Sequence, residues 1–547
     1  MLQVLKSKIE NYRKKRGEIN ILNAVKSGAL NARDETRKKI RVIIGPSFSV
    51  FRPSFLHDSL LASALTIRNA EIIPLYCDGI QSVECNYFGG IWTGNRNFTE
   101  NCKSCVKSSE SLWASYPNKT ALSKYLLKED YFAVDFQIDS LEDGLWLNYQ
   151  VDGLPIGAWA KDILVNNYGV GDYHKIKGHE FLGRRHVKNL LLLKKAYEGA
   201  LDDLAPDRIV SNDSYYGMWA LLEKLAKKRN IPFYSQWCGG RQKGWCYAYN
   251  DAAMNLNFSS AWSAFSKIEL YPKKREMVHQ WLLSRGMPNN DMMLNTAALG
   301  DHSLEEEALS KIDKTKPTVL LLANVIWDLA ALNKEIFFED MMSWIKETVK
   351  WFNDRPEYQL IIKAHPAELH PIVPATQETV GDMLKNSGLD LNENVIFLSP
   401  KVRATVYEFF SSTTVGLVHT STVGLELAAF GKYVITSGKS HYRGCGFTID
   451  PATREEYFAF LEKALLGDVR MDLGMMSELA YKFIYFYQFH YYSKINIMDF
   501  KYGEEPILRV KSIDDILPNK NIHFDYFVES IADGLPIVSE SRWPKES

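Results

Sequence analysis

The sequence of 547 residues has no apolar run that approaches the ~20 residues needed to cross a bilayer. Its first residues, Met1 to Lys6, lack the apolar core of a signal peptide. Cysteine is scarce, with seven in the chain, which argues against a disulfide scaffold and fits a reducing compartment. The formal net charge is only -1, so no global field recruits nucleic acid. These absences favour a cytoplasmic protein that does not bind nucleic acid.

The first 39 residues differ from the rest because they are basic and helical in pattern. Six of their positive charges lie close together, at Lys6, Lys8, Arg13, Lys14, Lys15 and Arg16. A solvated helix accounts for these charges, and peripheral contact with anionic lipid is the alternative. Any such contact is expected at the cytoplasmic face of the inner membrane.

Short apolar runs alternate with helical stretches along the whole chain. Strand-like runs cover 40–46, 70–79, 207–213 and 231–236 in the first half, and 318–324, 358–363, 395–398 and 415–418 in the second. Such alternation predicts an α/β fold with two doubly wound domains and mostly parallel sheets.

The charged segment 301–316 has no strand pattern and is predicted to be a linker. Before it, we expect an α/β domain over 40–300, and after it a second α/β domain over 317–475. The region 476–547 begins with many aromatic residues and is predicted to be helical, packing back on the first domain.

Three polar motifs follow predicted strands of the second domain. They are Asn324-Val325-Ile326-Trp327-Asp328, Lys363-Ala364-His365-Pro366 and His419-Thr420-Ser421-Thr422. Ligands of doubly wound sheets lie beyond the carboxyl ends of the strands. We therefore expect the three motifs to converge on one nucleotide.

The third motif opens a predicted helix, whose free N–H groups and dipole favour an anion. The hydroxyls of Ser421 and Thr422 lie at this helix start, and Glu426, one turn further, can reach a ribose hydroxyl. In the second motif, His365 can donate to a phosphate and Lys363 adds positive charge. A capping turn with a satisfied histidine is the alternative for this motif.

In this order, and followed by Tyr442-Arg443-Gly444-Cys445-Gly446-Phe447-Thr448, the motifs resemble those of bacterial capsule and surface polysaccharide biosynthesis glycosyltransferases, including the Kdo (3-deoxy-octulosonate) transferases. They are also similar to bacterial sialyltransferases, whose His-Pro and Ser-Ser/Thr motifs hold a cytidine monophosphate sugar. The resemblance is best over 318–450. It implies a GT-B architecture, in which two Rossmann-like domains face a cleft and a C-terminal helix returns to the N-terminal domain.

The resemblance further implies a glycosyltransferase that moves Kdo or another acidic sugar from a CMP donor onto a surface or capsular glycan or glycolipid. The donor site carried over by resemblance comprises Asn324, Trp327, Asp328, Lys363, His365, Pro366, Ser421, Thr422, Glu426, Tyr442 and Arg443. No metal ion is then required, because fixed donors stabilise the leaving phosphate. The alternatives are a nucleotide-sugar epimerase or hydrolase, a polyol-phosphate transferase of the same fold, and a non-catalytic glycan-assembly scaffold.

Glycosyl transfer also needs a general base for the acceptor hydroxyl. The related sialyltransferases carry an acidic pair followed by glycine, which Glu142-Asp143-Gly144 matches. Asp213, at the end of a predicted strand, is the alternative candidate for the general base. A plain polar turn is the alternative for Glu142 and Asp143, so the base stays open at this point.

Four of the seven cysteines lie close together in the sequence, at Cys77, Cys85, Cys102 and Cys105. Four thiolates can close a tetrahedral structural zinc site that pins a loop. Free thiols, and redox or iron–sulfur chemistry, are the alternatives.

Overall fold

The computed structural model describes residues 2–47, 49, 51–80, 85, 98–215, 217–287, 289–292, 302–327, 334–369, 376–402, 406–501 and 504–537. The chain divides into two compact units. Unit 1 comprises Met1–Ile163, Glu180–Leu256 and Tyr491–Ser547, and unit 2 comprises Leu164–His179 and Asn257–His490. The boundaries predicted at 40–300, 301–316 and 317–475 stay a prediction. Among the described helices, none is both long enough and apolar enough to cross a membrane.

Unit 1 is built on a sheet of seven strands. They are β1 (Ile40–Ser47), β2 (Ala70–Tyr76), β3 (Thr120–Ala121), β4 (Arg208–Asn212), β5 (Phe233–Cys238), β6 (Gly244–Tyr249) and β12 (Ser493–Lys494). Their order is β12-β6-β5-β4-β1-β2-β3. Strands β1 to β5 pair in parallel, whereas β6 and β12 extend the sheet antiparallel. The central strands are apolar runs buried on both faces, as expected for a parallel sheet.

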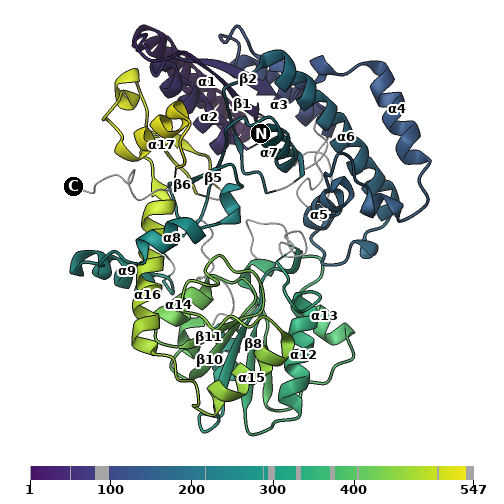
Figure 1. Ribbon diagram of the computed structural model, residues 1–547, viewed down its shortest axis with the longest axis vertical. Helices are drawn as coiled ribbons and strands as arrows, with labels where there is room; N and C mark the ends of the chain where they lie inside the picture. Colours follow the sequence, from purple (N-terminus) through teal and green to yellow (C-terminus); the bar gives the residue numbers. More distant parts are fainter. Residues whose placement is uncertain are drawn as a thin grey trace. The chain divides into compact units, whose positions relative to one another are not determined.

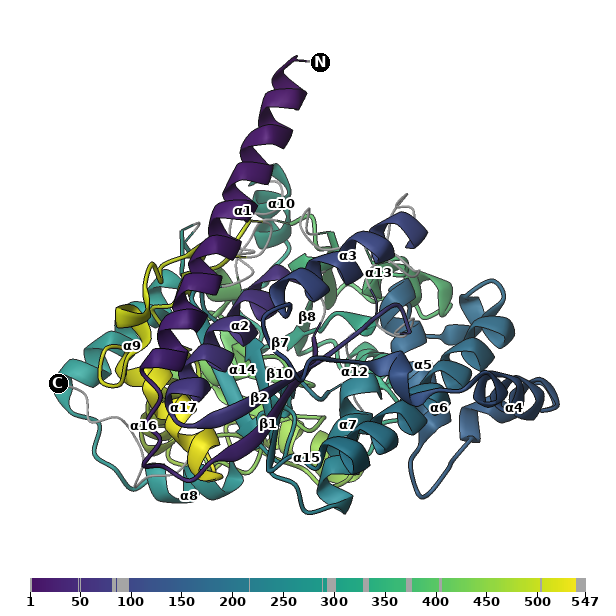
Figure 2. The same cartoon turned by 90° about the horizontal axis from the view of Figure 1, so that it is seen from above.

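The helices of unit 1 precede, connect and follow these strands. They are α1 (Leu2–Asn31), α2 (Arg52–Ile67), α3 (Phe98–Leu112), α4 (Lys128–Asp139), α7 (Gly217–Lys228), α17 (Ile522–Asp533) and the larger parts of α5 (Ile156–Tyr168) and α6 (His179–Leu204). The C-terminal half of α1 packs on α2, and Figure 2 shows α1 continuing past it towards the N-terminus.

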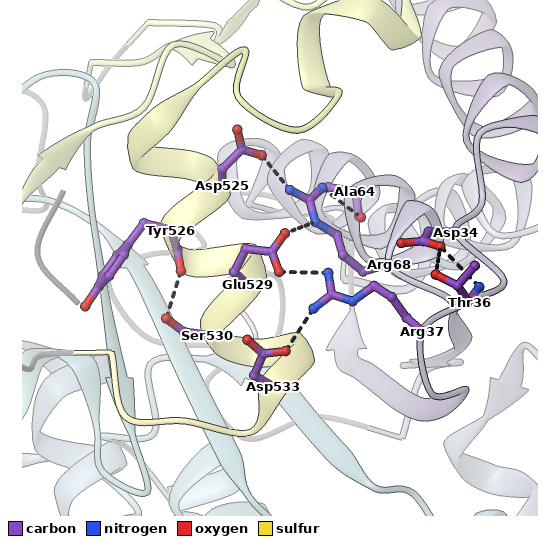
Figure 3. A network of polar contacts seen from close by, with 10 residues as sticks. All are labelled: Asp34, Thr36, Arg37, Ala64, Arg68, Asp525, Tyr526, Glu529, Ser530 and Asp533. Atoms are coloured by element: carbon purple, nitrogen blue, oxygen red, sulfur yellow. Dashed lines mark hydrogen bonds and ion pairs between the residues drawn. The ribbon is translucent and has the colours of Figure 1, made fainter. Parts of the chain in front are cut away.

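Helix α17, in the C-terminal segment of the chain, is bound to the rest of unit 1 by ion pairs. The buried guanidinium of Arg68, at the end of α2, donates to Asp525 at 2.7 Å and to Glu529 at 2.8 Å. Arg37 donates to the second oxygen of Glu529 and to Asp533, both at 2.8 Å. Figure 3 shows that Glu529 lies between the two arginines. The predicted return of a C-terminal helix to the first domain is therefore confirmed for α17.

Unit 2 has a second sheet, of five strands. They are β7 (Thr318–Leu322), β8 (Gln359–Lys363), β9 (Val395–Leu398), β10 (Thr413–Val418) and β11 (Tyr433–Thr436). All neighbours pair in parallel, in the order β11-β10-β7-β8-β9. Counted from the first strand of each unit, both sheets therefore contain the order 3-2-1-4-5 of a Rossmann fold. The predicted α/β class with two Rossmann-like sheets is confirmed.

The described helices of unit 2 are α8 (Ser259–Phe265), α9 (Pro272–Ser284), α10 (His302–Ser310), α12 (Met341–Asn353), α13 (Val380–Asn386), α14 (Val423–Ala429), α15 (Arg454–Leu465) and α16 (Leu473–Tyr485). Figure 1 shows α12, α14 and α15 beside the sheet of this unit. Helix α12 contacts β8 and β9, whereas α14 and α15 contact β10 and β11. The segment predicted as a linker contains α10. In each unit the strand order reverses between the first and fourth strands, at β1/β4 and at β7/β10, and each reversal marks the expected position of a ligand.

Candidate functional site

The reversal point of unit 2 lies where β7 and β10 end side by side. The side-chain oxygen of Asn324, just after β7, accepts a hydrogen bond of 3.4 Å from the backbone N–H of Thr420, just after β10. The first and third motifs are thus brought together. Trp327 is buried and donates its indole N–H to Thr376 at 3.0 Å. Asp328 lies outside the described residues.

The turn after β10 is stabilised by hydrogen bonds from residues of unit 2. The carbonyl of Ser421 accepts from the hydroxyl of Tyr442 and, at 3.2 Å, from the N–H of Gly424. A Cβ on Gly424 would lie 2.3 Å from the Tyr442 hydroxyl, so glycine is needed for this close approach. The buried side chain of Tyr442 therefore stabilises the turn after β10. The helix that follows, α14, has seven residues, and the side chain of its N-cap, Thr422, makes no capping hydrogen bond.

Glu426 is buried beside the turn, and both carboxylate oxygens have partners. Arg285 donates its Nε–H to one oxygen at 2.9 Å, and the hydroxyl of Tyr407 donates to the other. Burial and the charge of Glu426 raise the pKa of Tyr407 well above its usual value. Reasoning from the sequence missed Arg285 and Tyr407, because they lie 141 and 19 residues from Glu426 and no local pattern connects them.

Arg443, on the loop after β11, also has its donors engaged within unit 2. It donates to the hydroxyl of Thr436 at 2.5 Å and to the carbonyl of Pro451. The carboxylate of Asp450 lies 4.0 Å away. These contacts fix the loop 443–451 to the end of β11.

The second motif follows β8. Nδ1 of His365 accepts a hydrogen bond of 3.1 Å from the N–H of Ala367, which places the ring proton on Nε2. The next residue, Pro366, opens a short 3-10 helix, Pro366–Leu369. Lys363 is buried, and its ammonium lies 3.4 Å from the carbonyl of Ser399 and 3.3 Å from that of Val402. Burial lowers the pKa of Lys363 to about 8, so it remains cationic at neutral pH.

His419, the first residue after β10, is fully buried and has an unpaired ring nitrogen. Its Nδ1 lies 3.0 Å from the hydroxyl of Ser437, which itself donates to the carbonyl of Val418 at 3.3 Å. Nδ1 therefore carries the proton, and Nε2 is an acceptor with no hydrogen-bond partner. Burial lowers the pKa of His419 to about 4, so the ring is neutral at pH 7.

The reversal point of unit 1 carries one candidate base. Asp213 follows β4 directly, is buried, and accepts a hydrogen bond of 2.9 Å from the N–H of Met254. Burial, with the nearby charges of Glu223 and Asp251, raises the pKa of Asp213 to about 7. A carboxyl group that titrates near neutral pH suits general-base chemistry.

Glu142 and Asp143 lie elsewhere, in an exposed turn between α4 and the 3-10 helix Leu145–Asn148. The side chain of Asp143 is 87% exposed and lies 2.9 Å from the guanidinium of Arg184. Of the three candidate bases, Asp213 is thus the one in a desolvated position at a strand end.

The four clustered cysteines differ in exposure: Cys77 is buried, whereas Cys85, Cys102 and Cys105 are partly exposed. Burial, together with the neighbouring Cys105, raises the pKa of Cys102. Across the described part of the chain, no group of three or more His, Cys, Asp or Glu side chains is arranged to hold a metal ion. The four-cysteine zinc site stays a prediction.

No protein-family model matches the chain, and no curated protein sequence matches it. Solved structures do. KpsC of Thermosulfurimonas dismutans, a beta Kdo 2,4 transferase, is similar with 14% identity and a TM-score of 0.33, over 50% of this chain and 79% of that one. The UDP-GlcNAc 2-epimerase of Neisseria meningitidis is similar with 11% identity and a TM-score of 0.23, over 82% of this chain and 98% of that one. These values do not assign the chain to a family.

Proposed function

We propose that the protein is a metal-independent glycosyltransferase and that unit 2 binds its nucleotide-sugar donor. The observation that carries the proposal is the link between Asn324 and Thr420 at the β7/β10 reversal point. It gathers polar groups where a Rossmann-like sheet binds its ligand. The motif resemblance favours a CMP-activated acidic sugar such as Kdo as donor, and a glycan or glycolipid as acceptor.

Each polar group then has a role in the transfer. Negative charge develops on the phosphate as the sugar leaves, and fixed donors aimed at that charge lower the barrier. His365 contributes its Nε2–H, and Ser421 and Thr422 contribute hydroxyls. Glu426 holds Arg285 and Tyr407 beside the turn after β10, and each of its carboxylate oxygens keeps a second acceptor site for a ribose hydroxyl.

The acceptor hydroxyl loses its proton in the same reaction. We assign that proton to Asp213 of unit 1, because its carboxyl group has a pKa of about 7 and can take up a proton near neutral pH.

A nucleotide screen tests donor binding. A ligand that binds only the folded protein stabilises it by about 2.7 kcal/mol at 100 times its Kd. We expect CMP to raise the melting temperature more than UMP, GMP or UDP, measured by differential scanning fluorimetry. If none of these nucleotides raises it, the donor site is refuted and the glycan-assembly scaffold is favoured. A UDP preference with turnover in the absence of acceptor would instead favour the epimerase or hydrolase.

The His365→Ala variant tests the role of the imidazole. Loss of one donor to a developing anion costs on the order of 10²- to 10³-fold in kcat. We expect a decrease of this size in sugar transfer, followed by product chromatography, and partial recovery in His365→Gln, whose amide N–H can replace Nε2–H. His174→Ala is the matched control, since His174 is an exposed histidine of the same unit. Full activity of His365→Ala would refute the assignment.

A further inference from the structure

The turn that carries Asp213 is held from two sides. On one side, the N–H of Met254 donates to the Asp213 carboxylate at 2.9 Å. On the other, the hydroxyl of the next residue, Ser214, donates to the carboxylate of Glu223 on α7. Both Ser214 and Glu223 are buried, so this second contact is shielded from water.

Glu223 is a buried anion with two compensating cations. Its side chain is 3% exposed, and Lys227 and Lys224 approach the same oxygen to 2.7 and 3.3 Å. The two lysines reach it from the surface, since their side chains are 37% and 48% exposed. A hydrogen bond to Ser214 alone does not require a full negative charge, and a glutamine would satisfy it.

We infer that Glu223 is a positioning residue for Asp213: through Ser214 it fixes the turn, and its negative charge acts on the neighbouring carboxyl group. The inference rests on the proposed role of Asp213 as the base. Burial is the main cause of the raised pKa of Asp213, and the Glu223–Lys227 pair on α7 then adjusts that pKa.

Other groups also act on Asp213. Asp251, in the turn after β6, is a second negative neighbour that raises the pKa of Asp213. Its carboxylate accepts from the N–H of Ala252 at 2.9 Å and from Asn255, which are neutral donors, so none of the variants below changes its charge. The thiol of Cys246, on β6, is neutral, because burial raises its pKa well above 9. The N–H groups of Ala253 and Met254 favour the ionised form of Asp213.

Two charge changes should move the pKa of Asp213 in opposite directions. Glu223→Gln keeps an acceptor for Ser214 but removes the like charge, and we expect the pKa to fall by about one unit. Lys227→Met leaves Glu223 less compensated, and we expect the pKa to rise. Ser214→Ala removes the hydrogen bond to Glu223 without changing any charge. We expect lower turnover and an unchanged pKa of Asp213.

The measurement needs no substrate. Each variant is compared with the same variant carrying Asp213→Asn, and the pH above which their difference in melting temperature stops changing gives the pKa of Asp213 in the folded protein. Shifts of the same sign in Glu223→Gln and Lys227→Met, or no shift in either, would overturn the inference. Opposite shifts without transfer from any nucleotide sugar would uphold the electrostatic coupling and refute the proposed function instead. The pH profile of kcat should move with the same signs wherever turnover is present.

Discussion

Asp213→Asn is expected to lower glycosyl transfer on the order of 10³-fold while making the folded protein more stable above pH 7. The first effect follows because an amide cannot take up the acceptor proton, and general-base catalysis contributes about 10²- to 10⁴-fold. Asparagine is nearly isosteric with aspartate, and its side-chain oxygen still accepts from Met254. The chemistry is therefore removed with little change in packing.

The second effect follows from the raised pKa of Asp213, about 7 against an ordinary value of 3.8. Between these pH values the unfolded chain releases this proton and the folded chain keeps it, so wild-type stability falls as pH rises. The loss is complete above pH 7 and amounts to roughly 4 kcal/mol. Asparagine does not titrate, so the variant should melt above wild type at pH 8, and the gain should vanish near pH 4.

The turn that carries the other two candidate bases, Glu142 and Asp143, provides the control. Glu142→Gln/Asp143→Asn changes two exposed carboxylates, and we expect transfer within about twofold of wild type and no pH-dependent gain in stability. Wild-type transfer by Asp213→Asn, together with loss of transfer in the double variant, would move the base to the turn 142–144. Melting curves at pH 4, 6 and 8, measured beside kcat, distinguish the two assignments.

Arg68→Met is expected to loosen α17 by about 3 kcal/mol or more. Removing one partner of a buried ion pair costs about 3–5 kcal/mol, because the carboxylates left behind stay desolvated. The side chain of Arg68 is 1% exposed, whereas those of Asp525 and Glu529 are 12% and 34% exposed. Hydrogen exchange of the α17 amides should therefore accelerate roughly a hundredfold, since 1.4 kcal/mol corresponds to a factor of 10.

Arg37→Met is the matched control, because Arg37 shares Glu529 with Arg68. Its side chain is 29% exposed, and an exposed pair contributes about 0–1 kcal/mol. Exchange in α17 should then rise less than about fivefold. Equal effects of the two variants would show that burial does not set the strength of this network.

Eight strands of the two Rossmann-like sheets could be predicted from the sequence because each contains a short apolar run, whereas β3, with two residues, could not. The runs at 40–46 and 318–324, for example, became β1 and β7. The antiparallel extension of the first sheet could not be predicted. Strand β12 has two residues and pairs with β6 across some 250 positions, so its pairing depends on tertiary contact and has no local pattern.

The candidate site was predictable in outline for a similar reason. Polar residues after apolar runs identified Asn324 and Thr420, and the topology brought them together. The direction of individual side chains was not predictable. Tyr442 and Arg443 lie on the loop after a strand, where residues that contact the donor sugar are expected. The hydroxyl of Tyr442 instead donates to Ser421, and Arg443 donates to Thr436 and Pro451, all within the same unit. Sequence position places a residue near a site, whereas packing decides which way it points.

The division of unit 1 into three chain segments has a consequence for its synthesis. The ribosome makes β1 to β6 first, then nearly all of unit 2, and only then β12 and α17. Until β12 has left the exit tunnel, the outer edge of β6 is uncovered. Arg68 lacks both of its carboxylate partners until residue 525 has emerged, and it lacks the second of them until residue 529 has emerged. All residues of unit 2 are thus synthesised before the last strand and helix of unit 1. The unit whose synthesis starts first is therefore the one whose synthesis ends last.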